Sequence, residues 1–238
     1  MDSYTRRARL YPVSLLVFPL ALPVVALSWG PASWWVRLAA LAGACGVPLL
    51  AAQFGRSAGK RKEQALFSRW GGMPTTALLR HRTSTNRTAL ARRHDLISRA
   101  TGIVLPSAAD EHDDPTAADA VYETAVAALR EQTRDPDEFP LVFDELCSYG
   151  FRRNLWGHRT LGIVLAVGGA LVALGAAVLG AATAIQVSVP IALMVAAVDS
   201  ILVVIWARVI TEDWVRQAAD AYAERLLSSA ERLPAPRT

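Results

Sequence analysis

Two long stretches of the sequence are almost free of charge, and they limit the possible folds more than any other feature. Residues 10–54 contain one formal charge, Arg37, and residues 160–207 contain one, Asp199. A helix needs about 20 apolar residues to cross the hydrocarbon core of a bilayer. Each stretch is therefore long enough for two membrane-spanning helices joined by a tight turn. The overall composition hides this distribution, because 53% hydrophobic residues would also suit a soluble enzyme with a large core.

Four spans are expected within these stretches. They are predicted at residues 11–29, 33–54, 161–185 and 187–207. Three prolines fall in the first span, where neighbouring membrane helices can satisfy the carbonyl groups that a proline leaves without a donor. Tryptophans gather at the turn between the first two spans, where an aromatic belt belongs; they are Trp29, Trp34 and Trp35.

Basic residues flank the spans on one side of the membrane. They are Arg6, Arg7, Arg9, Arg56, Lys60, Arg61, Lys62, Arg152, Arg153, Arg159 and Arg208. Because cytoplasmic loops are enriched in Lys and Arg, both termini and the segment between the hairpins are expected in the cytosol. A rival interpretation takes the first span as a signal peptide cleaved near 26–28. Its 19-residue apolar stretch is long for such a peptide, and cleavage would leave three spans and upset the charge pattern.

The expected fold is an all-α membrane protein, with four transmembrane helices in two hairpins and a helical cytosolic module inserted between them. Its segments are an N-terminal transmembrane hairpin at 1–54, the cytosolic module at 55–160, a C-terminal transmembrane hairpin at 161–207 and a cytosolic helical tail at 208–238. Module helices are predicted at 88–100, from Pro115 to 134–136, and from Phe139 to Tyr149, after which Gly150 permits a bend. The tail is predicted to extend the fourth span and to pack on the module or on a neighbouring subunit.

The module divides sharply by charge. Residues 56–99 contain eleven Arg or Lys and two acids, whereas residues 100–151 contain two Arg and twelve acids. One interpretation is that the basic half lies on anionic lipid and pairs with the acidic half of its own or a neighbouring subunit. The other is that part of the basic half is a pocket for an anionic ligand such as a nucleotide, because the planar fork of arginine suits phosphate.

The most distinctive local pattern runs from Gly71 to Arg82. Two glycines free the backbone, Pro74 starts a helix, and two threonines in its first turn are predicted to point outward beside free N–H groups. The pattern lacks the Gly-Lys-Ser/Thr of a Walker A loop, and as a bare pattern it is also an ordinary helix start. The residues expected to bind an anion are Thr75, Thr76, Arg80, Arg82, Arg87, Arg92 and Arg93.

Three segments of the central third carry a resemblance to a known family. Gly71 to Arg82, Phe139 to Phe143 and Tyr149 to Gly157 resemble a largely uncharacterised family of small bacterial multi-pass membrane proteins. The layout of the chain is also similar to that of the four-transmembrane effectors of nucleotide-signalled antiphage defence. The resemblance implies a place in the bacterial inner membrane, and it supplies no catalytic residues.

Polar residues in and beside the spans are the remaining candidates. Asp199 lies near the middle of the fourth span, where a charge costs roughly 2.5–3.5 kcal/mol on insertion scales. It is expected to line a pore or accept protons, or to be a protonated acid hydrogen-bonded to a neighbouring helix. Gly162, Ala166 and Ala170 have the four-residue spacing of closely packed membrane helices, within or between subunits. The juxtamembrane residues expected to meet lipid are Arg152, Arg153, Asn154, Trp156, His158 and Arg159.

No enzyme is indicated by the sequence. The four histidines lack metal-ligand spacing, nucleophile signatures are absent, and neither a metal nor a cofactor is expected. The run from Glu111 to Asp114 could hold a metal but is predicted to be a solvated loop before a helix cap. A lipid-modifying site combining Arg152, Asn154 and His158 is the competing idea, although lipid anchoring explains the same residues more simply.

Two functions are compatible with these observations. The first is an oligomeric membrane effector or channel-like protein whose cytosolic module senses an anionic small molecule, such as a nucleotide, or a partner protein. The second is a non-conducting, membrane-anchored interaction protein that recruits a partner to the charged module. Both place the chain in the lipid bilayer of the inner membrane, with the N and C termini cytosolic, and nothing in the sequence indicates nucleic acid binding.

Overall fold

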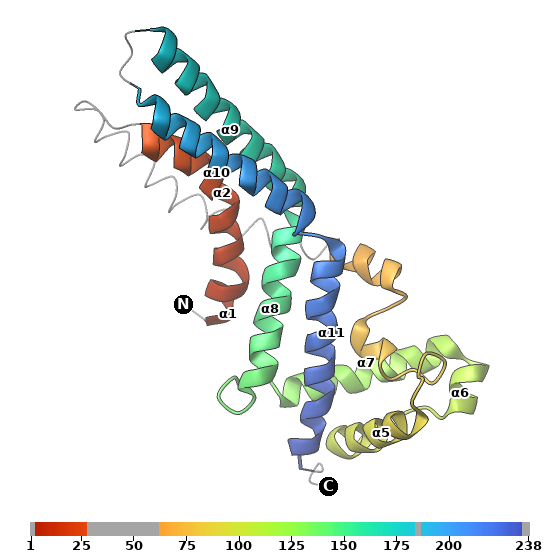
Figure 1. Cartoon of the computed structure of the whole chain (residues 1–238). Helices are drawn as coiled ribbons and strands as arrows, with labels where there is room; N and C mark the ends of the chain where they lie inside the picture. Colours follow the sequence, from red (N-terminus) through yellow and green to blue (C-terminus); the bar gives the residue numbers. More distant parts are fainter. Residues whose placement is uncertain (1–2, 28–61, 184–186, 235–238) are drawn as a thin grey trace. The chain divides into compact units, whose positions relative to one another are not determined.

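The computed structural model describes residues 3–27, 62–183 and 187–234 of the chain (Figure 1). Within these residues every regular element is helical, which confirms the all-α prediction for this part of the chain. The described residues divide into two compact units. The first, called here the membrane unit, comprises 3–27, 62, 150–183 and 187–215. The second, called here the charged unit, comprises 63–149 and 216–234.

Three helices of the membrane unit are long and apolar enough to cross a bilayer: Ser3–Ala26, Arg159–Ala182 and Val189–Arg208. These lengths and compositions mark the chain as a membrane protein. The first of the three combines α1 (Ser3–Thr5), the π-helical turn η1 (Arg6–Leu10) and α2 (Tyr11–Leu27). The others are α9 (Arg159–Ala182) and α10 (Val189–Arg208). The span predicted at 33–54 lies outside the described residues.

Small side chains on α9 contribute to the contacts between the membrane helices. Helix α9 packs against both α2 and α10, and α2 also meets α10 (Figure 1). The predicted four-residue spacing is found on the inner face of α9, where Gly162, Ala166 and Ala170 are buried. A Cβ atom added to Gly162 would overlap the indole ring of Trp206 on α10, so the glycine permits the close approach. The outer faces of α9 and α10 carry exposed leucine, valine and isoleucine, as lipid contact requires.

The charged unit is built from short helices that begin and end at local sequence signals. Its helical elements are residues 63–70, α4 (Pro74–Ala77), α5 (Arg87–Thr101), α6 (Ala108–Asp113), α7 (Pro115–Gln132), the first part of α8 (Pro140–Gly157), the second part of α11 (Glu212–Ser228) and the 3-10 turn η2 (Ser229–Arg232). Asn86 caps α5, and Gly102 ends it with a φ of 73°. Asp114 caps α7 by accepting hydrogen bonds from Thr116 and Ala117, and Pro115 follows as the first helical residue.

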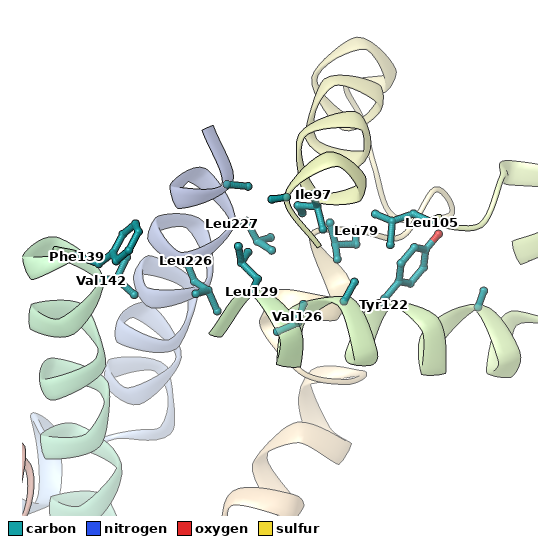
Figure 2. Close-up of a cluster of buried hydrophobic side chains, with 14 residues drawn as sticks. Leu79, Ile97, Leu105, Tyr122, Val126, Leu129, Phe139, Val142, Leu226 and Leu227 are labelled. Atoms are coloured by element: carbon teal, nitrogen blue, oxygen red, sulfur yellow. The ribbon is translucent and has the colours of Figure 1, made fainter. Parts of the chain in front are cut away.

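A single apolar core joins α5, α7, α8 and α11 in the charged unit (Figure 2). Leu129 of α7 lies in this core with Leu226 and Leu227 of α11, all at most 1% exposed. The final helix therefore completes the core of a unit that begins more than 150 residues earlier. The tail thus packs on residues of the predicted module, although α11 is not the predicted extension of α10. Residues 209–211 interrupt the helix between them.

Gly150 does not produce the predicted bend. Helix α8 runs unbroken through this position to Gly157. A Cβ atom at Gly150 would lie 3.0 Å from Ala8 Cβ and 3.0 Å from Tyr4 Oη, so the glycine allows α1 and η1 to approach α8 closely. Residues 150–160, predicted as the end of the cytosolic module, accordingly belong to the membrane unit.

Candidate functional site

The threonines of the Gly71–Arg82 pattern face the interior of the charged unit. Gly71 and Gly72 have φ angles of 77° and 128°, and Pro74 begins α4 as predicted. The helix has only four residues, and Thr75 and Thr76 are 7% and 1% exposed. The prediction that their hydroxyls point outward is wrong, because this turn directs them inward ahead of the buried Leu79. Neither hydroxyl can contribute to an open anion site in this conformation.

Arg80 is held entirely by groups of the charged unit. Its Nε and Nη2 atoms donate to the two carboxylate oxygens of Asp119 on α7 at 2.9 and 2.8 Å. Its Nη1 donates to the carbonyl of Gly71 at 2.6 Å. The side chain is only 11% exposed, so this bidentate pair is largely shielded from water. Arg80 therefore fastens the glycine turn to α7.

Glu111 is the centre of a buried network that sequence reasoning missed. Its carboxylate accepts the backbone N–H groups of His81 and Arg82 at 2.7 and 3.1 Å. It also accepts Arg82 Nη1 at 2.9 Å and the Tyr122 hydroxyl at 2.8 Å. The residue is 2% exposed and belongs to helix α6, so the prediction of a solvated loop at this position is wrong. We call Arg80, Arg82, Glu111, Asp119 and Tyr122 the carboxylate cluster.

The pKa values in the carboxylate cluster follow from these contacts. Burial raises the pKa of Glu111, but the donors from His81, Arg82 and Tyr122 outweigh it and lower the pKa to about 2. Burial also raises the pKa of Asp119, but the hydrogen bonds from Arg80 and Arg82 outweigh it. The pKa of Asp119 is therefore lowered. Burial and the bond to Glu111 raise the pKa of the Tyr122 hydroxyl. Two arginines thus face two carboxylates, and their charges balance.

Two histidines sit beside the carboxylate cluster. The rings of His81 and His94 meet edge to face with centroids 4.8 Å apart. His94 Nε2 lies 2.7 Å from the carbonyl of Leu79, and His81 Nε2 lies 3.2 Å from that of Pro106. Burial lowers the pKa of His94 more than the bond to Leu79 raises it. Through these contacts the two rings hold the loop around Leu79 in place.

The other predicted arginines divide into paired and unpaired side chains. Arg92 Nη2 is 3.0 Å from Glu231, in an exposed pair, and Arg93 Nη1 donates to the Leu78 carbonyl at 3.1 Å. Arg87, in the first turn of α5, makes no hydrogen bond or ion pair with any residue of the described ranges. With Arg80 and Arg82 engaged in the carboxylate cluster, this pattern favours internal pairing of the basic and acidic halves. Among the arginines predicted to bind an anion, Arg87 is the one whose side chain remains available.

A groove of about 520 Å³ opens beside Arg87. Arg82 lines this groove, and its side chain is 37% exposed despite its pairing. The groove is lined by His81, Arg82, Arg87, Ala91, Ala108, Glu111, His112 and Pro115. We call it the Arg87 groove. Its volume lies within the range of small-molecule sites, roughly 300–1,000 Å³. Arginine side chains such as the two in this lining can pair with a carboxylate or phosphate group.

The juxtamembrane residues hold the membrane unit together. Asn154 Nδ2 donates to the carbonyl of Ala8 at 2.7 Å, and Arg152 Nη1 donates to that of Trp214 at 3.0 Å. Arg159 donates from Nε and Nη2 to the carbonyls of Trp206 and Ala207 at 3.1 and 2.6 Å. The two bonds from Arg159 satisfy carbonyl groups in the last turn of α10 that would otherwise lack donors.

The rest of the juxtamembrane group also engages its own unit. His158 Nδ1 lies 2.8 Å from the Asn154 carbonyl, and the Lys62 ammonium lies 5.6 Å from the Trp156 ring centre. Arg153 also has a partner. The three residues considered for a lipid-modifying site, Arg152, Asn154 and His158, thus make hydrogen bonds to backbone carbonyls of the membrane unit. Within the described ranges, no group of three His, Cys, Asp or Glu residues could hold a metal ion.

Asp199 is enclosed by the membrane helices of its own chain. It is 0% exposed and sits on the inner face of α10, with Ala192, Val195 and Ala196. Neither carboxylate oxygen has a hydrogen-bond partner among the described residues. The side chain therefore faces the interior of the bundle, as expected, and does not lie on an open surface.

No protein-family model, curated protein or solved structure matches this chain.

Proposed function

We propose that this chain is a membrane-anchored binding protein, and that its charged unit takes a small anionic ligand, such as a nucleotide, in the Arg87 groove. The observation that carries the proposal is the unpaired Arg87 beside the partly exposed Arg82 in a groove of ligand size. Among the predicted arginines, Arg80, Arg82 and Arg92 already pair with carboxylates of their own unit, so added negative charge in this groove would gain Arg87 as a partner.

The proposed setting is a bacterial inner membrane crossed four times. Three apolar helices support it, together with the apolar stretch at 33–54, whose one formal charge is Arg37, as the fourth span. The basic flanks favour cytosolic termini and a cytosolic charged unit. In this arrangement a ligand from the cytosol reaches the groove without crossing the bilayer.

A conducting pore is the less favoured function. The one acid of α10 that could line a cation path is 0% exposed and lies beside Gly169 of α9 and the Pro19 carbonyl of α2. A pore lined by Asp199 would require these helices to separate. We therefore propose a non-conducting anchor, with binding at the charged unit as the activity.

Binding by the purified full-length chain in lipid nanodiscs tests the proposal. Arg87→Glu is the test variant, and Arg130→Glu is its control, because Arg130 is another exposed helical arginine with the same change of charge. We expect ATP, the first probe, to bind the wild type and Arg130→Glu with similar affinity. Loss of a charge-assisted contact worth about 1.5–3 kcal/mol should weaken binding to Arg87→Glu at least tenfold.

Two outcomes would contradict the proposal. ATP and inorganic pyrophosphate could both fail to bind the folded wild-type protein, or the two variants could bind them equally. Proteoliposomes loaded with a potassium-sensitive dye test the channel alternative. Ligand-dependent flux that disappears in Asp199→Asn would favour a pore.

A further inference from the structure

The interior of the membrane unit contains two oxygen acceptors that face one small space. One is the carboxylate of Asp199 on α10, which is 0% exposed and has no hydrogen-bond partner among the described residues. The other is the backbone carbonyl of Pro19 on α2. A Cβ atom added to Gly169 of α9 would collide with both. Three helices therefore converge at this point, and the missing side chain of Gly169 leaves the space between the two oxygens.

The Pro19 carbonyl lacks its usual helical donor for a reason visible in the sequence. In an α-helix the carbonyl of residue 19 accepts from the N–H of residue 23. Residue 23 is a proline inside α2 and has no N–H. A carbonyl without a donor in an apolar bundle is costly, and a neighbouring side chain is one group that can satisfy it.

No charged side chain of α2, α9 or α10 lies close enough to Asp199 to stabilise its carboxylate in the ionised form. Helix α2 has no charged residue, and the charges of α9 and α10 stand at their ends, at Arg159 and Arg208. Arg208 is nine positions from Asp199, which corresponds to about 14 Å along a helix. Tyr11, the titratable residue of α2, is eight positions from Pro19, about 12 Å away. Arg37 lies outside the described residues.

We infer that Asp199 is a proton-binding site, occupied in the folded membrane unit, and that its O–H donates to the Pro19 carbonyl. A proton is the smallest group that turns two facing acceptors into a donor and an acceptor. It also removes the charge from an apolar interior. A hard metal cation is a poorer occupant, because it prefers six or more oxygens, and the Asp199 carboxylate with the Pro19 carbonyl could supply three at most. Gly169 has no side chain that would block the hydrogen bond between Asp199 and the Pro19 carbonyl. Pro23 has no N–H that would compete for that carbonyl.

Infrared difference spectroscopy of the intact chain in lipid nanodiscs tests this inference directly. At pH 8 the exposed carboxyl groups of the chain are ionised, so a protonated-acid C=O band should come from a buried acid. We expect this band in the wild type and its absence in Asp199→Asn. The asparagine amide can still donate to Pro19, so this variant should remain folded.

A second variant identifies the acceptor. Pro23→Ala supplies the missing N–H, which then competes for the Pro19 carbonyl. The acid band should move to higher frequency, because a weaker hydrogen bond strengthens the acid C=O bond. Pro12→Ala is the control, because it also replaces a buried proline of α2. Residue 12 is seven positions, about two helical turns, from Pro19, so the frequency of the acid band should not change. No acid band in the wild type, or a band that is the same in Pro23→Ala, would overturn the inference.

Discussion

The hydroxyl of Tyr122 donates to Oε2 of Glu111 at 2.8 Å, inside the charged unit. The backbone N–H of His81 donates to the same oxygen, and Arg82 supplies two donors to Oε1. One carboxylate thereby fixes helix α6, the loop at 81–82 and helix α7. A buried charge with four donors is stable in its ionised form, and its removal would leave those donors unpaired.

Acid should destabilise the charged unit through Glu111. Its pKa is about 2 in the fold, against 4.5 ordinarily, so the unfolded chain binds the proton more tightly. The stabilisation is complete above about pH 4.5 and is lost as pH falls toward 2. The difference corresponds to about 3 kcal/mol. We expect Glu111→Gln to be less stable than the wild type at pH 7 and to lose less stability below pH 4.5, in denaturant unfolding of the detergent-solubilised chain.

Asp113→Asn provides the comparison for this pH profile. Asp113 is an exposed carboxylate of the same helix, so its removal should leave the wild-type slope between pH 4.5 and 2. If Glu111→Gln and the wild type lost the same free energy of unfolding over this range, Glu111 would not be the source of the acid sensitivity.

The pair of Arg80 and Asp119 should contribute measurably to stability. The contact is bidentate and mostly shielded, in contrast to the pair of Arg134 and Glu131, whose side chains are 79% and 74% exposed. A double-mutant cycle with Arg80→Ala and Asp119→Ala should give a coupling free energy of about 1–3 kcal/mol. The same cycle on the exposed pair should give about 0.5 kcal/mol or less. Equal coupling in the two cycles would show that shielding does not matter here.

Local sequence signals predicted most of the helices. Asp114 followed by Pro115 marked the start of α7, apolar periodicity marked α5, and the long stretch with one charge at 160–207 marked both described C-terminal spans. The limits of those spans agree with the helices to within three residues. These features depend on neighbours along the chain, so one sequence suffices to find them.

The candidate site could not be predicted in the same way. Glu111 binds groups about 30 positions away, and no local pattern distinguishes this role from that of an exposed acid. Two signals were present nonetheless. Ser107 and Asp110 form a capping box that starts α6, and Tyr122 occupies an apolar position of α7 where a buried hydroxyl needs a partner. Gly150 shows the same limit of sequence reasoning. From the sequence alone, a glycine that lets a helix bend cannot be distinguished from one that lets another helix, remote in the sequence, pack closely against it.

The C-terminal helix should be essential to the charged unit. Leu226 is 0% exposed in the core shared with α7, so Leu226→Ala should cost about 2–5 kcal/mol. Leu141→Ala is the matched change, because Leu141 is 54% exposed and should cost less than 1 kcal/mol. Limited proteolysis at 63–149 should accelerate in the first variant alone. Equal protease resistance would mean that α11 is dispensable for this core.

Glycines of α9 should differ in their tolerance of alanine according to what they face. A Cβ at Gly162 would overlap the Trp206 indole, whereas a Cβ at Gly168 meets nothing within 4 Å. Alanine is favoured over glycine in a helix by about 1 kcal/mol, so Gly168→Ala should be neutral or stabilising. Gly162→Ala must instead push α10 away, at a cost of about 1–3 kcal/mol. Unfolding in a series of mild detergent and SDS mixtures measures both variants. Equal midpoints would mean that α9 and α10 do not pack through Gly162 and Trp206 in the membrane.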